Sequence, residues 1–185
     1  MTVDTLWFQT TQANQRAEQA YHGLCERYDD FLEFSRRTRV SKRRFRTLVS
    51  RISQSGAPYG AHTIVYRSTG ELLLVRHDGV DLWVLPGGEV GSEETFREAA
   101  ARELAEEAGV SVSYDGLAMT TRVDIECGDH STWGVVPVFA ARAESVEPDV
   151  SDPDGEITAA RWFDELPSDT RDRAEVLQWR ETALT

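Results

Sequence analysis

The chain has 185 residues, of which 32 are acidic and 20 basic, and a formal net charge of −12. So acidic a surface repels phosphate backbones, which argues against nucleic-acid binding over the general surface. No run of about 18 apolar residues is present, so we expect no membrane span. The first residues also lack the basic start and long apolar stretch of a secretory signal.

Cysteine and lysine usage describe the environment of the protein rather than its function. Cys25 and Cys127 have no metal-like or redox-like spacing, so we expect a reduced, cytoplasmic compartment. Lys42 is the single lysine, and arginine in place of lysine together with excess carboxylate resembles proteins adapted to high salt. Salt screens the self-repulsion of such a chain, because the Debye length falls to about 3 Å at 1 M.

Residues 1–57 predict a helical extension. Apolar residues recur at spacings of three and four over 12–34, which predicts a helix. A second helix is predicted from about 42 to 53, with Phe45, Leu48 and Ile52 on one face. Eight basic residues and no acid lie between 36 and 51: Arg36, Arg37, Arg39, Lys42, Arg43, Arg44, Arg46 and Arg51.

This basic block has two interpretations. We expect it first to dock onto the acidic remainder of the chain, or to form a homodimer, because opposite charge attracts it there. The alternative is an anion site for a phosphate-rich substrate or for RNA, and Arg36–Arg51 is the one segment suited to contact nucleic acid.

A turn-rich segment, 54–60, ends the helical pattern and places a domain boundary near Pro58. Beyond it, strands are predicted to alternate with turns. Strands with one central and one terminal helix indicate a mixed α/β domain over 58–185. The predicted strands are 61–67, 71–77, 81–85, 111–125, 131–143 and 157–163, and the closing helix is 169–181.

The central helix follows the turn Leu85-Pro86-Gly87-Gly88. Thr95 and Glu98 are in capping-box register, so the helix begins at Phe96, and Gly109 suits the left-handed position after its end. Three carboxylates, those of Glu103, Glu106 and Glu107, share one face of its last two turns.

Anions at this end of a helix are unfavourable, since each like-charge neighbour costs about 0.2–0.5 kcal/mol and the helix dipole adds to the penalty. A divalent cation on that face would remove the penalty. Dense oxygen ligands suit Mg²⁺ or Mn²⁺ better than Zn²⁺. A solvated face of an acidic chain is the alternative interpretation.

The wider stretch has a more specific pattern. It reads Gly88, five residues, Glu94, seven residues, then Arg102-Glu103-Leu104-x-Glu106-Glu107-x-Gly109-Val110. Over 23 residues this resembles the signature of the Nudix (MutT-like) hydrolases at every defined position. The resemblance implies an α/β/α sandwich with a mixed sheet over 58–185, preceded by the N-terminal α-helical extension.

The resemblance also implies roles within the stretch. Glu103, Glu106 and Glu107 are the expected metal ligands and catalytic acids, with the backbone carbonyl of Gly87 completing part of the shell. Gly88, Glu94, Arg102 and Gly109 are expected to be structural. The family pattern ties Arg102 to Glu94, and the sequence spacing also favours an i, i+4 ion pair between Glu98 and Arg102.

Further candidates lie outside the stretch. Glu156 precedes the last strand, where several family members place an additional ligand or general base, and His130 is the rival base. Arg76 resembles positions that contact a substrate phosphate. Trp83 and Trp133 could stack on a nucleobase, although packing in the sheet is the simpler role.

The implied function is a metal-dependent pyrophosphohydrolase. Its small-molecule substrate would be a nucleoside diphosphate linked to another moiety, of the nucleotide-sugar, ADP-ribose or (d)NTP type. Markers of the coenzyme-A, ADP-ribose and dinucleoside-polyphosphate subfamilies are missing, so no single substrate is indicated. The alternatives are an RNA 5′-end pyrophosphohydrolase and a non-catalytic nucleotide-sensing regulator.

Overall fold

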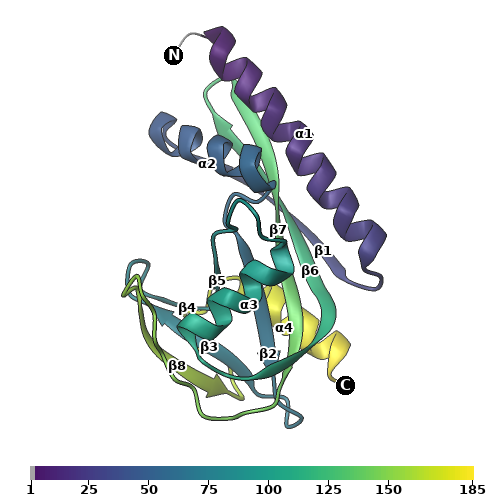
Figure 1. Ribbon diagram of the computed structural model, residues 1–185, viewed down its shortest axis with the longest axis vertical. Helices are drawn as coiled ribbons and strands as arrows, with labels where there is room; N and C mark the ends of the chain where they lie inside the picture. The colour runs from purple at the N-terminus through teal and green to yellow at the C-terminus, as the bar shows by residue number, and fades with distance from the viewer. Residues whose placement is uncertain (1–2) are drawn as a thin grey trace.

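The computed structural model describes residues 3–185 and arranges them as four helices and one mixed sheet (Figure 1). The helices are α1 (Val3–Arg27), α2 (Lys42–Ser55), α3 (Phe96–Glu107) and α4 (Arg173–Ala183). The strands are β1 (Leu32–Arg39), β2 (Ala61–Tyr66), β3 (Leu72–His77), β4 (Leu82–Val84), β5 (Gly87–Gly88), β6 (Val112–Cys127), β7 (His130–Ala143) and β8 (Ile157–Phe163). Within these residues no helix combines the length and apolar character needed to cross a membrane.

The sheet has the strand order β1-β6-β7-β2-β3-β4, and β5 and β8 pair with β2 and β3 respectively. Two pairs are parallel, β1 with β6 and β2 with β7, while the others are antiparallel. The mixed sheet expected from the sequence is therefore confirmed.

Helices cover both faces of the central strands. Alternate residues of a strand point to opposite faces. On one face Ile64 and Leu74 pack with Trp179 of α4, and on the other Val65 and Leu73 pack with Leu104 of α3. In Figure 1, α3 lies in front of the sheet and α4 behind it. This is the expected α/β/α sandwich.

The hairpin of β6 and β7 extends the sheet toward the N-terminal helices (Figure 1). Its turn is Gly128-Asp129, as the sequence predicts. Val123 and Ile125 on this hairpin form one buried cluster with Phe45, Leu48 and Ile52 of α2 and with Leu6, Ala13 and Ala17 of α1. The N-terminal helices are thus held by apolar packing on the extended hairpin.

The helix predicted over 12–34 is wrong at both ends, since α1 already begins at Val3. α1 ends at Arg27, Asp30 adopts a left-handed φ of 56°, and β1 then pairs in parallel with β6 along its length. Tyr28 continues the helical spacing, but it packs edge-on against Phe139 of β7, with 5.7 Å between ring centroids. Pairing with a free sheet edge overrides the local pattern here. The extension therefore contains a strand, and the boundary near residue 58 stays a prediction.

Candidate functional site

The turn and helix of the stretch from Leu85 to Val110 form as the sequence predicts. Thr95 accepts from the backbone N–H of Glu98, and the carboxylate of Glu98 accepts from the backbone N–H of Thr95, which completes the capping box. Gly109 ends the helix with φ 62°, and a Cβ there would lie 2.4 Å from the carbonyl oxygen of Asp149. Both ends of α3 are therefore fixed by local geometry.

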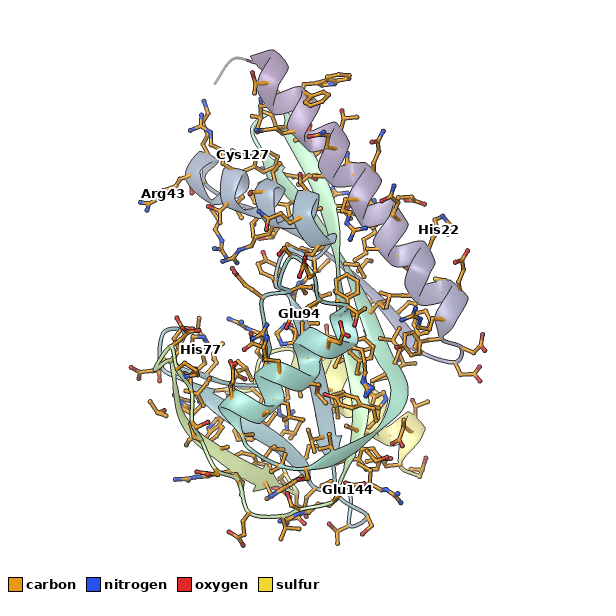
Figure 2. All side chains as sticks on the ribbon, in the orientation of Figure 1. His22, Arg43, His77, Glu94, Cys127 and Glu144 are labelled. Carbon is orange, nitrogen blue, oxygen red and sulfur yellow. The ribbon has the colours of Figure 1, made fainter. Side chains whose placement is uncertain are left out.

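Arg102 joins the loop before α3 to its carboxylate face. Its Nε lies 2.7 Å from Oε1 of Glu94 and its Nη2 lies 3.0 Å from Oε2. The same guanidinium donates to the carbonyl of Glu89 and to Oε1 of Glu103, the latter at 2.7 Å. Glu94 lies near the end of α3 that faces the N-terminal helices (Figure 2).

The expected tie between Arg102 and Glu94 is confirmed by these contacts. The ion pair expected between Arg102 and Glu98 does not form, because the capping box already occupies the carboxylate of Glu98. Hydrogen bonds from Arg102 lower the pKa of Glu94 below its ordinary value. The pair is consequently charged throughout the physiological pH range.

Glu107 is a buried carboxylate with only 8% of its surface exposed. Its Oε2 accepts from the backbone N–H of Gly87 at 3.0 Å. Burial raises the pKa of Glu107 to about 8, and repulsion from Glu103, Asp152 and Glu106 adds to the rise, whereas the Gly87 hydrogen bond opposes it. A cation beside this carboxylate would offset both unfavourable contributions.

Glu103 lies directly against Gly88. A Cβ on Gly88 would approach the carboxyl carbon of Glu103 to 2.6 Å, so this position requires glycine for reasons of space. Burial also raises the pKa of Glu103, and Arg102 opposes that rise. Glu106 is placed differently: its carboxylate lies 3.6 Å from Nη1 of Arg102.

A cleft of about 910 Å³ brings these groups together. Its lining includes Gly87, Gly88, Glu103, Glu107 and Glu156, whereas Glu106, Glu94 and Arg102 are not part of it. The volume lies in the range typical of small-molecule sites, about 300–1,000 Å³. Of the three helix carboxylates, two therefore face the cleft and the third lies beside it.

The sequence missed three further cleft residues, Asp152, Asp154 and His77. The two aspartates belong to the acidic loop before β8, where they are close enough to influence the pKa values of Glu107 and Glu103 respectively. His77 ends β3, and its Nε2 lies 3.3 Å from Oε2 of Glu156, while its Nδ1 is buried without a hydrogen-bond partner among the described residues. Position at the end of a predicted strand was the only signal that the sequence offered for His77.

Three candidates from the sequence lie elsewhere. Arg76 is not in the cleft lining; it pairs with Asp81 and with Asp169 at 2.5 Å, so the expected phosphate contact has no support from its position. His130 is at the tip of the β6–β7 hairpin against Phe45, with 6.4 Å between ring centroids, and it does not line the cleft. Trp83 packs edge-on with Phe163 at 4.8 Å, as the simpler role predicts.

Trp133 is also outside the cleft. The guanidinium of Arg122 lies over its ring at 4.1 Å, and the ring borders a separate hollow along α1. Neither tryptophan is therefore placed to stack on a nucleobase bound in the cleft.

The basic block contributes to the same cleft. Arg36 and Arg37 of β1 and Arg44 and Arg51 of α2 are among its lining residues, with Arg171. Half of the block is paired with acids: Arg36 with Asp172, Arg51 with Glu89, and Arg37 and Arg39 with Glu126. Within the described residues, Lys42, Arg43, Arg44 and Arg46 form no ion pair. Docking onto the acidic remainder of the chain thus explains the placement of only four of the eight basic residues.

The donor set can be compared with the needs of a divalent cation. Among residues 3–185, no three His, Cys, Asp or Glu side chains are already arranged around a common metal position. Glu103 and Glu106 turn toward Arg102 instead. The chemistry nevertheless fits a hard cation, because a buried carboxylate without a cationic partner lies among three other acids and all donors are oxygen.

Comparison with known proteins agrees with this geometry. A putative 8-oxo-dGTP diphosphatase of Bacillus subtilis (strain 168) is 34% identical over 89 residues, covering 48% of this chain and 60% of that protein. A MutT-like protein of Streptomyces ambofaciens is 41% identical over 54 residues, covering 29% of this chain and 35% of that protein. The chain thus spans less than two thirds of the length of either relative.

A solved structure shares the fold. The NUDIX domain of Shewanella oneidensis NrtR complexed with ADP ribose superposes with a TM-score of 0.51 at 17% identity, covering 68% of this chain and 86% of that one. The model of the NUDIX domain matches residues 57–179, more than half of the chain. The chain therefore belongs to the NUDIX domain family.

Proposed function

We propose that the chain is a divalent-cation-dependent pyrophosphohydrolase that cleaves the diphosphate of a nucleoside diphosphate linked to another moiety. One observation supports this most: the cleft gathers Glu103, Glu107, Glu156 and the Gly87-Gly88 turn around a space of nucleotide size. Hydrolysis of a diphosphate is slow in water because an anionic phosphorus centre repels an anionic nucleophile. A bound Mg²⁺ or Mn²⁺ supplies charge neutralisation and lowers the pKa of water.

Glu103, Glu106 and Glu107 would hold the cation, with the backbone carbonyl of Gly87. Gly88 allows Glu103 to approach the turn, and the hydrogen bond from Gly87 holds Glu107 there. Arg102 and Glu94 keep the loop in place, while Gly109 ends the helix beneath it. These last three residues position the site and do not touch substrate.

Glu156 is the proposed proton acceptor for the attacking water. It lines the cleft together with Glu103 and Glu107, and His77 lies 3.3 Å from its Oε2. The contact orients the carboxylate, and the backbone N–H of Glu156 is itself held by Asp152 at 2.6 Å. His77 is therefore a positioning residue for Glu156.

The proposed substrates are nucleotide sugars, ADP-ribose or (d)NTPs. The Bacillus subtilis relative is named for a nucleotide-triphosphate derivative, which favours that class for this chain. A regulator that only binds nucleotide would not need three acids on one helix face, and here all three are present.

The test is product release from a panel of nucleotide sugars, ADP-ribose, triphosphates and triphosphorylated RNA, with and without Mg²⁺, in high salt. We expect Mg²⁺-dependent release of two phosphorylated products from a small nucleotide. Activity that is insensitive to a chelator would overturn the metal dependence. Exclusive cleavage of RNA with a steep loss of affinity as salt rises would favour the RNA-end enzyme instead.

A further inference from the structure

The basic block and the carboxylates lie far apart in the sequence but border one cleft. β1 and α2 supply Arg36 and Arg44, whereas α3 and the loop before β8 supply the acids. Figure 1 shows α2 above the half of the molecule that carries α3, with β1 along the edge of the sheet. Because β1 pairs with β6 over its whole length, Arg36 is carried by a fixed strand of the sheet.

Arg44 is the member of the block with the most distinctive surroundings. It is exposed and borders the cleft, and it forms no ion pair with any described residue. Its guanidinium lies 5.9 Å from the centroid of the Tyr59 ring, and that of Arg36 lies at the same distance from this ring. One aromatic ring thus orients two guanidinium groups at the cleft, and one of them lacks a counter-ion.

The orientation of α2 explains why only some of its basic side chains border the cleft. Arg44 and Arg51 are seven residues apart, which places them on one face two turns apart. Arg43 and Arg46 are equally exposed but do not line the cleft. Arg43 points outward from the end of α2 (Figure 2). The chain therefore offers matched arginines on the same helix, inside and outside the cleft.

We propose that Arg44 and Arg36, oriented by Tyr59, form an anion subsite that binds phosphate groups beyond the diphosphate being cleaved. The proposal rests on the proposed function and narrows its substrate class. The substrate class is a small nucleotide with additional phosphates, for which the acidic side of the cleft holds the scissile diphosphate and its cation. A guanidinium binds phosphate through two parallel hydrogen bonds, so arginine suits this role better than lysine.

A small nucleotide suits the cleft better than RNA does. The cleft has the volume of a small-molecule site, and the chain around it carries a strong excess of negative charge. Glu89, Asp172 and Glu175 also line the cleft. Such a surface repels a long polyanion, while a few phosphates can be held by the local arginines.

The experiment measures steady-state kinetics of the full chain with Mg²⁺ and adenosine 5′-phosphates of increasing length, ADP, ATP and adenosine 5′-tetraphosphate, and with ADP-ribose. The variants are Arg44→Gln and Arg36→Gln, with Arg43→Gln and Arg46→Gln as controls. For Arg44→Gln we expect KM for the tetraphosphate to rise about tenfold or more, the scale of one charge-assisted hydrogen bond. We expect kcat and the KM for ADP-ribose to change less than about threefold, and both controls to behave as the unchanged chain.

A binding measurement separates this proposal from the proposed function. Inorganic tripolyphosphate, titrated by calorimetry, should bind the unchanged chain and bind Arg44→Gln at least about tenfold more weakly. That result supports the subsite even if no substrate is hydrolysed. Hydrolysis with equal kinetics and equal tripolyphosphate binding in Arg44→Gln and Arg43→Gln would overturn the subsite and leave the proposed function standing.

Two further outcomes would also overturn the proposal. The first is a change of oligomeric state or melting temperature in Arg44→Gln without a change in KM, because the block would then serve docking. The second is a KM effect confined to triphosphorylated RNA and equal for Arg43, Arg44 and Arg46, because a diffuse RNA surface would explain it.

Discussion

The backbone N–H of Gly87 donates to Oε2 of Glu107 at 3.0 Å, which joins β5 to the last turn of α3. Among residues 3–185 this is the one hydrogen bond to the carboxylate of Glu107, which is only 8% exposed. Ionised Glu107 is therefore electrostatically unfavourable in the metal-free fold, and this unfavourable free energy is the penalty at a position where the family pattern places a metal ligand.

That penalty predicts a pH-dependent stability for the metal-free chain. The pKa of Glu107 is raised to about 8 in the fold, so the folded state binds a proton more tightly than the unfolded state. The resulting stability is present at low pH and is lost as pH rises through the window from about 4.5 to 8, by about 1.4 kcal/mol per pH unit. The melting temperature in chelator should therefore fall with pH by roughly 3–6 °C per unit relative to Glu107→Gln. A constant difference between the two proteins across this window would contradict the prediction.

Arg102 should affect catalysis through geometry. Arg102→Lys keeps the charge but cannot reproduce the two-point contact with Glu94, so we expect kcat to fall about 10- to 100-fold, as for other residues that support metal ligands. The apparent Mg²⁺ requirement should rise as well. Arg97→Lys is the control, because Arg97 is on the same helix and stacks on Tyr114 at 4.0 Å outside this network. Equal kcat and Mg²⁺ dependence in the two variants would refute the role.

Gly60 should be far less tolerant of a side chain than Gly70. Both have a left-handed φ, 79° and 92°, but a Cβ on Gly60 would lie 1.8 Å from the carbonyl oxygen of Gly88, while a Cβ on Gly70 meets nothing within 4 Å. Gly70→Ala should cost about 1–2 kcal/mol from backbone strain alone. Gly60→Ala should cost at least about 2 kcal/mol more, because the Gly88 turn must move. Urea denaturation measures the loss in free energy of unfolding for each variant. Equal losses would show that the turn at Gly60 is not packed against Gly88.

His77 should matter for turnover because it contacts Glu156. We expect His77→Gln to lower kcat about tenfold with little change in KM, since the proposed proton acceptor loses its orienting partner. His22→Gln is a matched control: His22 forms a similar pair with Glu18 at 3.0 Å on α1, away from the cleft (Figure 2). If both variants turn over at the rate of the unchanged chain, Glu156 does not depend on His77.

Local interactions made the central stretch predictable. The capping box and the left-handed Gly109 depend on residues close together in the chain, so spacing predicts them. The tie between Arg102 and Glu94 was implied by the family resemblance, whereas spacing alone favoured a pair between Arg102 and Glu98 that does not form. Even so, helical spacing alone did not show that Glu103 and Glu107 face the cleft while Glu106 lies beside it.

Tertiary packing decided the features that sequence reasoning missed. β1 forms because the edge of β6 accepts it, although its first residues continue a helical pattern. The approach of Arg44 to a cleft bordered by Glu103 depends on how α2 packs on the β6–β7 hairpin. The two acids that hold Arg76 follow it by five residues and by 93, and the distant one has no local signal.

The central claim is that the carboxylates of α3 hold the cation needed for hydrolysis of a phosphoanhydride. The most direct test measures Mg²⁺-dependent product release by the unchanged chain, Glu106→Gln and Glu107→Gln, on the best substrate of the nucleotide panel. We predict that each substitution lowers kcat by orders of magnitude while the chain stays folded by circular dichroism. Turnover equal to that of the unchanged chain in both variants would contradict the claim.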